Sequence, residues 1–301
     1  MRRQLPLGLL NLFSPFLFFL ILIQGCSSPF LQTYAADEKD SEIVLAAFSR
    51  FQQNNTALCK CCLDAEADII ISVSGWFHDQ TGKLSGYLQA MKPGYVRFVA
   101  VNPLGQPWYI LVTDGETFKS LNVFEEKAYE GSVHSRTYNK ISPPGFEAGF
   151  SYYWLTGNLE PGRMHIRAVM HDRTMHDAYW LQMKHAGESS ESMILFDPVK
   201  RLILRHVLRS EKGEYLAEVS YEDYRPLIGE VQNNFRQNSS ADISNRDEGE
   251  HCWLPGRITL SSHKGSEKIE LKLHSFIAEA HFAPTDFTLE IPENFEQLFV
   301  R

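Results

Sequence analysis

The sequence predicts a mainly β protein of the α+β class, with one large curled antiparallel sheet of about 11 strands whose concave face is partly covered by two helices. Most of the chain beyond residue 67 consists of short segments in which apolar and polar residues alternate, separated by turns rich in Gly, Pro and Asp. Such segments are typical of antiparallel strands joined by hairpins. Only two segments have helical spacing, and a sheet this large must curl or be covered.

The strand-like segments form two groups. The first extends from 67 to 130 and includes tight turns at Lys92-Pro93-Gly94 and Asp114-Gly115. The second extends from 163 to 275. Between 232 and 250 the chain is too polar to pack against a core, which predicts a loop.

Two amphipathic segments predict helices. Residues 41–53 carry apolar side chains at helical spacing, with Ser41 as the expected N-cap. A second such segment, 145–156, should end at Gly157. The aromatic residues of both segments either line a hollow under the sheet or simply fill a core. Those that we expect at the cavity or its lid are Phe48, Phe146, Phe150 and Trp154.

Residues 1–25 differ in kind from the rest of the chain. Arg2 and Arg3 precede a largely apolar stretch with an unbroken run at 16–23, which is typical of an export signal. The alternative, an uncleaved membrane anchor, needs about 20 predominantly apolar residues, and Pro6 and Pro15 are among the interruptions. We therefore expect a signal peptide over 1–25.

The end of this segment, Ile23-Gln24-Gly25-Cys26, resembles the lipobox of bacterial lipoproteins. The resemblance implies cleavage after Gly25 and acylation of Cys26, followed by a lipidated tether over 26–40. Residues 1–25 contain two arginines and no acid, so the rest of the chain carries −10 rather than the −8 of the whole sequence. An acidic body gains nothing from anionic headgroups, which makes a covalent lipid anchor appropriate.

Four cysteines remain after Cys26, and they leave three alternatives open. Cys59, Cys61 and Cys62 are clustered, whereas Cys252 is distant. An exported chain permits disulfides, so a bridge to Cys252 is one alternative and structural or free thiols are another. The third, a metal site, lacks the paired spacing typical of zinc.

The composition argues against several functions. An acidic chain is a poor electrostatic binder of nucleic acid. Motifs for nucleophilic, phosphoryl or hydride chemistry are absent from the sequence, so we expect no enzyme activity, no catalytic residues and no cofactor. His171-Asp172 and His176-Asp177 are more typical of a solvated hairpin than of a metal site.

Several turn motifs, taken in order, resemble a known family. They are Asn102-Pro103-Leu104-Gly105, the Asp114-Gly115 hairpin, Trp154-Leu155-Thr156-Gly157 followed by Pro161, and Leu254-Pro255-Gly256-Arg257-Ile258. Together with the lipobox they are similar to LolB, the outer-membrane lipoprotein receptor, and its relatives. The similarity covers roughly half of the chain.

The resemblance implies an open half-barrel with a short helical lid, which forms a lipid-binding domain over 41–301 with the polar loop 232–250 as an addition. It implies an apolar cavity for lipoprotein acyl chains or other lipid, a periplasmic LolA-like carrier as partner, and an anchored position on the periplasmic side of the outer membrane. It also implies that Leu104 lies on a protruding membrane-insertion loop, where Pro103 and Gly105 set the turn and Trp108 adds an interfacial group.

Two alternatives to this interpretation stay open. In the first, Leu104 folds back under the sheet rather than protruding. In the second, the protein is a structural envelope lipoprotein that docks a protein partner and carries no lipid.

Overall fold

The computed structural model describes residues 31–59, 61–74, 79–135, 137–142, 146, 151–162, 164–185, 191–227, 251–262, 267–277 and 280–300. The predicted signal peptide, Cys26 and the first residues of the tether lie outside the described residues. So do Phe150 and the loop 232–250. The predictions made for these parts remain predictions.

Fifteen strands form one sheet. In sheet order they are β1 (Thr33–Ala35), β8 (Met164–Asp172), β9 (Tyr179–His185), β10 (Glu191–Asp197), β11 (Leu202–Arg209), β12 (Tyr215–Glu222), β15 (Arg257–Ser262), β16 (Glu267–His274), β2 (Cys62–Ser74), β3 (Asp79–Met91), β4 (Tyr95–Val101), β5 (Pro107–Thr113), β6 (Thr117–Asn122), β7 (Lys127–Ser132) and β17 (Glu296–Val300). A separate pair consists of β13 (Arg225–Leu227) and β14 (Cys252–Leu254).

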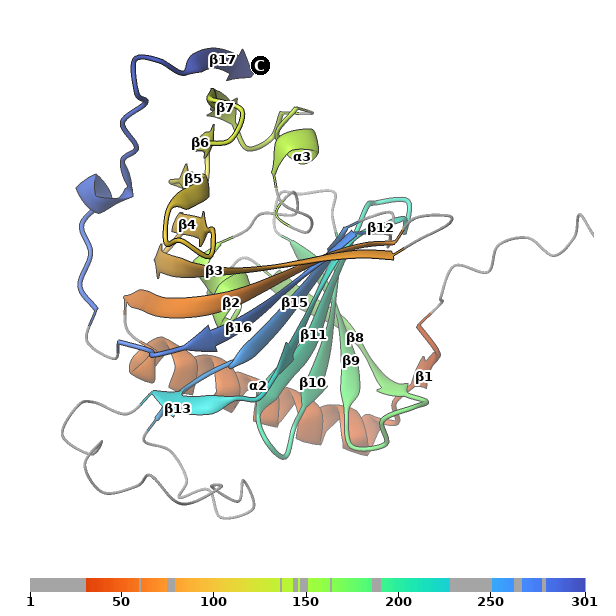
Figure 1. Ribbon diagram of the computed structural model, residues 1–301. Coiled ribbons are helices and arrows are strands. Elements are labelled where there is room, and N and C mark those ends of the chain that lie inside the picture. Colours follow the sequence, from red (N-terminus) through yellow and green to blue (C-terminus); the bar gives the residue numbers. More distant parts are fainter. Residues whose placement is uncertain are drawn as a thin grey trace, which may run out of the picture.

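The sheet curls without closing, because β1 and β17 lie at its two edges (Figure 1). The predicted fold class, a large curled antiparallel sheet with few helices, is therefore confirmed. The strand number exceeds the expected 11 or so, partly because both edge strands are too short to show alternation. β17 also departs from the antiparallel pattern, since it pairs with β7 in parallel.

The first helix, α2, is longer than predicted and begins earlier. It extends over Glu38–Leu58 rather than 41–53, and its N-cap is Asp37 instead of Ser41. The Asp37 carboxylate accepts a hydrogen bond from the backbone N–H of Asp40 at 2.8 Å. A carboxylate satisfies the unpaired N–H groups at a helix start and interacts favourably with the helix dipole, so Asp37 is the stronger cap.

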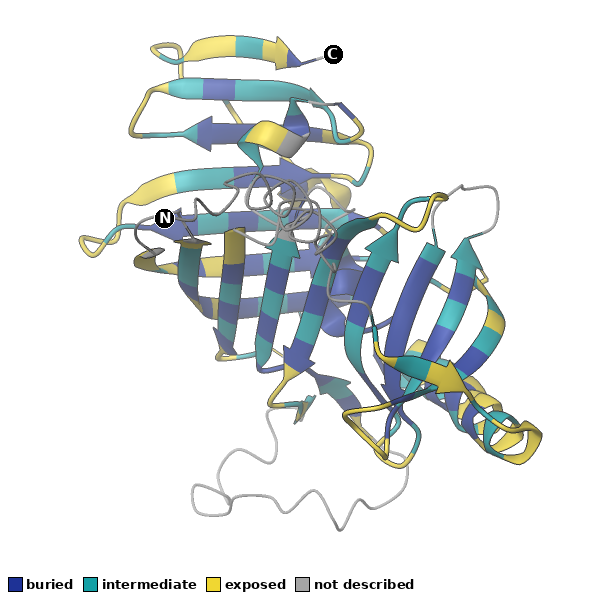
Figure 2. Ribbon diagram, turned by 90° about the vertical axis from the view of Figure 1, so that its right-hand side faces the viewer, coloured by how far each residue is buried: buried dark blue, intermediate teal, exposed yellow. Residues whose placement is uncertain are grey.

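Helix α2 runs across the strands on one face of the sheet (Figure 1). Its buried side chains are Val44, Phe48 and Phe51. Phe48 packs edge-on against Phe196 of β10 at 5.2 Å between ring centroids, and Phe51 lies 5.5 Å from the same ring. These aromatic contacts join α2 to the main core, which Figure 2 shows as buried positions alternating with less buried ones along the strands.

Two short helices follow the first group of strands. They are α3 (Tyr138–Ile141) and α4 (Tyr152–Thr156). The helix expected over 145–156 thus begins later than predicted, because the backbone of its N-cap, Ser151, is extended. As predicted, α4 ends at Gly157, whose backbone is left-handed with φ of +65°. Glycine tolerates this conformation because it has no Cβ.

The C-terminal segment covers part of the sheet's other face. A 3₁₀ turn, η3 (Pro284–Phe287), places Phe287 against Cys62, Met91 and Val112. Arg97 of β4 donates hydrogen bonds to the carbonyls of Asp286 and Thr288, at 2.6 and 2.8 Å. The segment then continues to β17 at the sheet edge.

Candidate functional site

A cleft of about 450 Å³ lies between the C-terminal half of α2 and the segment that contains α4; we call it the α2–α4 cleft. The residues that line it come from α2, from the turn between β3 and β4, and from the chain around and after α4. They are Phe51, Gln52, Gln53, Asn55, Thr56, Ala57, Lys92, Tyr152, Tyr153, Asn158, Leu159, Pro161 and Gly162.

The cleft combines apolar walls with a few polar groups. Phe51, Tyr152 and Leu159 are buried and present aromatic or aliphatic surface to it. Tyr153 packs edge-on against Tyr152, with 5.5 Å between the ring centroids. Sites for small ligands typically have volumes of about 300–1,000 Å³, apolar walls and a few placed polar groups. The dimensions and chemistry of the cleft match that description.

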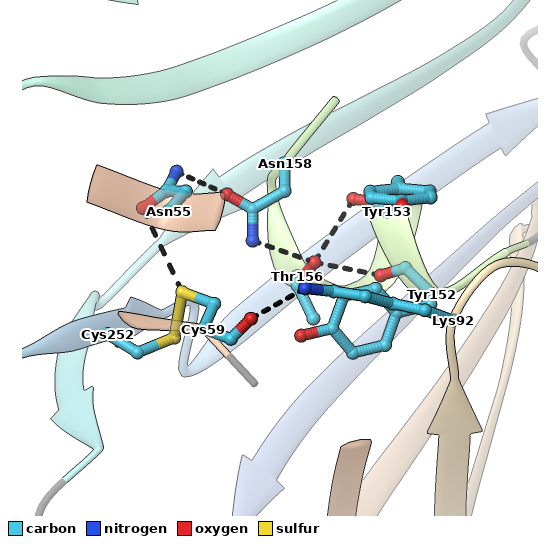
Figure 3. Close-up of a disulfide and its surroundings, with 8 residues drawn as sticks. All are labelled: Asn55, Cys59, Lys92, Tyr152, Tyr153, Thr156, Asn158 and Cys252. Atoms are coloured by element: carbon cyan, nitrogen blue, oxygen red, sulfur yellow. Dashed lines mark hydrogen bonds between the residues drawn. A yellow bond between two sulfur atoms is a disulfide. The ribbon is translucent and has the colours of Figure 1, made fainter. Parts of the chain in front are cut away.

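A chain of hydrogen bonds holds the α4 segment against α2 (Figure 3). The side-chain amide of Asn55 donates to the side-chain carbonyl of Asn158. The Asn158 amide donates to the Thr156 hydroxyl at 3.0 Å, and that hydroxyl donates to the backbone carbonyl of Tyr152 at 2.8 Å. The Asn55–Asn158 hydrogen bond joins α2 to the chain after α4 across the cleft, and we call it the Asn55–Asn158 latch.

Lys92 supplies the cleft with a charged group. Its ammonium donates a hydrogen bond to the backbone carbonyl of Cys59 at 2.6 Å and lies 5.3 Å from the centre of the Tyr152 ring (Figure 3). Burial lowers the pKa of Lys92 below its ordinary value of 10.5. Among the described residues Lys92 forms no ion pair with a carboxylate.

A disulfide joins Cys59 to Cys252 directly beside the cleft (Figure 3). Of the three alternatives that the sequence left open, the structure shows the bridge to Cys252. Both residues are buried, and the bond ties the C-terminal end of α2 to β14. The structure also pairs the adjacent Cys61 and Cys62.

The predicted cavity residues that the structure describes lie in the core near the cleft and do not line it. Phe48 and Phe146 are fully buried, and Trp154 is nearly so. Trp154 stacks on His206 with 4.6 Å between ring centroids. The cleft is instead lined by Phe51, Tyr152 and other neighbours, which sequence spacing alone did not single out.

Beneath Trp154 lies a small polar cluster inside the core. His206 and His185 each share a hydrogen bond with the Ser192 hydroxyl, at 2.7 and 2.8 Å respectively. Burial, with a smaller contribution from the charge of His185, lowers the pKa of His206 to about 3. His206 is therefore neutral at physiological pH.

Leu104 protrudes from the turn between β4 and β5, with 83% of its surface exposed. The Asn102 side chain accepts hydrogen bonds from the backbone N–H groups of Leu104 and Gln106, at 2.9 and 3.0 Å. Gly105 completes the turn with φ of +79°. The turn is thus held rigidly with its apolar side chain outward, and Leu104 does not fold back under the sheet.

Two further apolar side chains are exposed near Leu104. Trp108, at the start of β5, is 45% exposed, and Phe124, in the turn between β6 and β7, is 82% exposed. The backbone N–H of Val123 donates to the carbonyl of Trp108 at 3.0 Å, which brings these two positions together. The sequence did not predict that Phe124 joins these exposed apolar side chains, because no motif marks the turn between β6 and β7.

Residues 173–178 form the expected hairpin turn between β8 and β9, but His171 and Asp172 belong to the end of β8, and Asp172 is buried rather than solvated. Asp172 accepts hydrogen bonds from the Trp180 indole at 2.6 Å and from the backbone N–H of Thr174 at 2.7 Å. His171 pairs instead with Asp40 of α2 at 3.2 Å. No group of three or more His, Cys, Asp or Glu within the described ranges is arranged to hold a metal ion.

The open curled sheet with α2 across one face and the short helix α4 is consistent with a LolA/LolB-like fold. Among solved structures, a LolA superfamily protein from Nitrosomonas europaea is similar over 80% of this chain and 97% of its own, with a TM-score of 0.51 and 10% identity. A DUF1329 family protein from Desulfovibrio piger is similar over 82% and 96%, with a TM-score of 0.50 and 10% identity.

At such identities the likeness concerns the fold. The sequence matches no protein-family model and no curated protein. In the part of the chain that the structure describes, none of the helices has the length and apolar character needed to cross a membrane.

Proposed function

We propose that this protein is an outer-membrane-anchored lipoprotein that binds lipoprotein acyl chains or another lipid in the α2–α4 cleft and assists lipoprotein localisation. The observation that carries the proposal is the cleft itself, an apolar-walled space of about 450 Å³ under the lid of an open LolA/LolB-like sheet. Binding by burial requires no catalytic residue.

The energetics favour a bound acyl chain. Each methylene that is buried contributes about 0.8 kcal/mol, so a chain with ten methylenes in the cleft would gain roughly 8 kcal/mol before the costs of association. The latch between Asn55 and Asn158 is a single side-chain hydrogen bond, whose net contribution is about 1 kcal/mol. This one contact can break for the lipid to enter and leave, while Tyr152, Trp154 and Leu155 of α4 stay buried in the core.

The exposed turns suit a membrane surface. Leu104, Trp108 and Phe124 present apolar side chains near one another at one end of strands β4–β7. Exposed apolar groups of this kind insert into the interfacial layer of a bilayer, where Trp is especially favourable. In this proposal Cys26 holds the protein on the membrane, the turns contact the lipid, and a periplasmic LolA-like carrier delivers cargo to the cleft.

The direct test is to purify the exported protein, extract it with organic solvent and identify lipids by mass spectrometry. We expect a co-purified lipid in stoichiometric amount and uptake of a fluorescent fatty acid. When cells are depleted of this protein, their outer-membrane lipoproteins should be mislocalised. Purified protein free of lipid and unable to take up the fluorescent fatty acid would contradict the proposal.

A second candidate function is docking of another envelope protein. It is favoured by the edge strand β17, which extends the sheet beyond β7 and bears Phe299 with 74% of its surface exposed. An edge strand can pair with an extended segment of a partner. Cross-linking from position 299 in intact cells should capture a specific envelope protein if this function is correct, whereas the lipid-binding function predicts no partner at β17 other than the LolA-like carrier.

A further inference from the structure

Lys92 stands out among the residues of the α2–α4 cleft because it is the charged one among the described lining residues. The α2 residues that share the lining contribute amide and hydroxyl groups, and the α4 segment contributes phenols, an amide and apolar surface. An ammonium group in an apolar-walled cleft is costly unless a counter-charge accompanies it.

The present contacts of Lys92 account for part of its hydrogen-bonding capacity. An ammonium has three N–H donors, and the described contacts use one of them, to the Cys59 carbonyl. That carbonyl belongs to the C-cap of α2, where a positive charge interacts favourably with the helix dipole. The Tyr152 ring, with its centre at 5.3 Å, provides a cation–π contact. None of these groups carries a negative charge.

From this arrangement we infer that Lys92 makes the cleft selective for a single-chain lipid with an anionic head group, a carboxylate or a phosphate. The chain lies along Phe51, Tyr152 and Leu159, and the head group accepts a hydrogen bond from the Lys92 ammonium. The inference rests on the proposed function, because it specifies the lipid class bound at that same site.

The size of the cleft supports one chain rather than several. A volume of about 450 Å³ lies in the lower part of the range for sites that hold one small ligand. A fatty acid or a lysophospholipid, each with one chain and an anionic head group, would fit as a whole.

The head-group contact should depend on pH in one direction. Lys92 holds an anion only as an ammonium, so the preference for an anionic lipid should disappear as pH rises through its lowered pKa. Among the described residues that line the cleft, the titratable groups besides Lys92 are the phenols of Tyr152 and Tyr153. Burial raises the pKa of Tyr152, which keeps that phenol neutral over the same range. Cys59 is disulfide-bonded and does not titrate.

The test uses the full exported chain reconstituted in lipid nanodiscs and two photoreactive probes, a C16 fatty acid and the matching C16 alcohol, each with a diazirine on the chain. Labelling is quantified by intact mass and located by peptide mapping. We expect the acid to label cleft peptides about tenfold more than the alcohol, as one charge-assisted hydrogen bond would produce. Competition by lysophosphatidic acid or by unlabelled fatty acid then distinguishes a phosphate from a carboxylate head.

Variants separate the head-group role from a structural one. Lys92→Met should reduce acid labelling to the level of the alcohol, Lys92→Arg should retain the preference, and Lys212→Met, at an exposed turn outside the cleft, should change nothing. If Lys92→Met does not fold, the inference is tested by two other results: the Lys92→Arg variant should keep the preference for the acid, and the wild type should lose that preference as pH rises.

Three outcomes bear on the inference in different ways. Equal labelling by acid and alcohol in the wild type would overturn the inference and leave the proposed function standing. Undiminished acid labelling in a folded Lys92→Met protein would do the same. Absence of cleft labelling by either probe would contradict the proposed function itself.

Discussion

Removal of the Cys59–Cys252 disulfide is expected to lower the free energy of unfolding substantially. The two cysteines are 193 residues apart in sequence. In the chain-entropy model a crosslink that closes a loop of this length restricts the unfolded chain by about 5 kcal/mol at 25 °C, whereas disulfides in general contribute about 2–4 kcal/mol. We therefore expect the double variant Cys59→Ser/Cys252→Ser to lose about 2–5 kcal/mol.

The assay is equilibrium unfolding in guanidinium chloride followed by circular dichroism. The reference protein, which keeps Cys59 and Cys252, and the Cys59→Ser/Cys252→Ser variant should both carry Cys61→Ser and Cys62→Ser. The two proteins then differ only in the Cys59–Cys252 disulfide. Dithiothreitol should lower the midpoint of the reference to that of the variant and leave the variant unchanged. Equal midpoints for the two proteins without reductant would refute the reasoning, since the disulfide would then not constrain the unfolded chain.

Three other predictions concern the latch, the turn and the buried histidine. A double-mutant cycle with Asn55→Ala and Asn158→Ala should show a coupling of about 1 kcal/mol in the free energy of unfolding, and the variants should release bound lipid faster. A coupling of zero would show that the Asn55–Asn158 hydrogen bond does not stabilise the protein. Leu104→Glu should weaken binding of the protein to lipid vesicles and change the free energy of unfolding by less than about 0.5 kcal/mol. The control, Val199→Glu in another exposed turn, should leave vesicle binding unchanged. His206 has a pKa of about 3 when folded, below its ordinary 6.5, so the unfolded chain takes up a proton first as pH falls. Stability should therefore drop by about 1.4 kcal/mol per pH unit between about 6.5 and 3, and His206→Gln should flatten that slope; an unchanged slope would contradict the assignment.

The fold could be predicted well from local patterns. Alternation between apolar and polar residues, together with Gly and Asp turns, identified the strands of the central sheet, because each such strand buries one face. The left-handed C-cap at Gly157 was recognised for a similar reason, since few residues adopt that conformation. The edge strands β1 and β17 were missed because they are short, and their pairing depends on distant strands.

The site was less predictable than the fold. The exposed Leu104 could be anticipated because Asn102, Pro103 and Gly105 define its turn locally. The α2–α4 cleft could not be anticipated, since it is formed by residues from three distant segments. The Lys92-Pro93-Gly94 turn was recognised, but nothing local shows that Lys92 faces a cleft. Pairing of Cys59 with Cys252 was likewise one of several options, because connectivity cannot be deduced from cysteine spacing.

The central claim is that the α2–α4 cleft holds one lipid chain, and its most direct test is to fill the cleft. Ala57 lines the cleft, whereas Ala46 is exposed on α2 outside it, so Ala57→Trp and Ala46→Trp form a matched pair on one helix. Native mass spectrometry of the exported protein should show one bound lipid in the wild type and in Ala46→Trp. The same measurement should show none in Ala57→Trp. Equal lipid occupancy in all three proteins would contradict the claim.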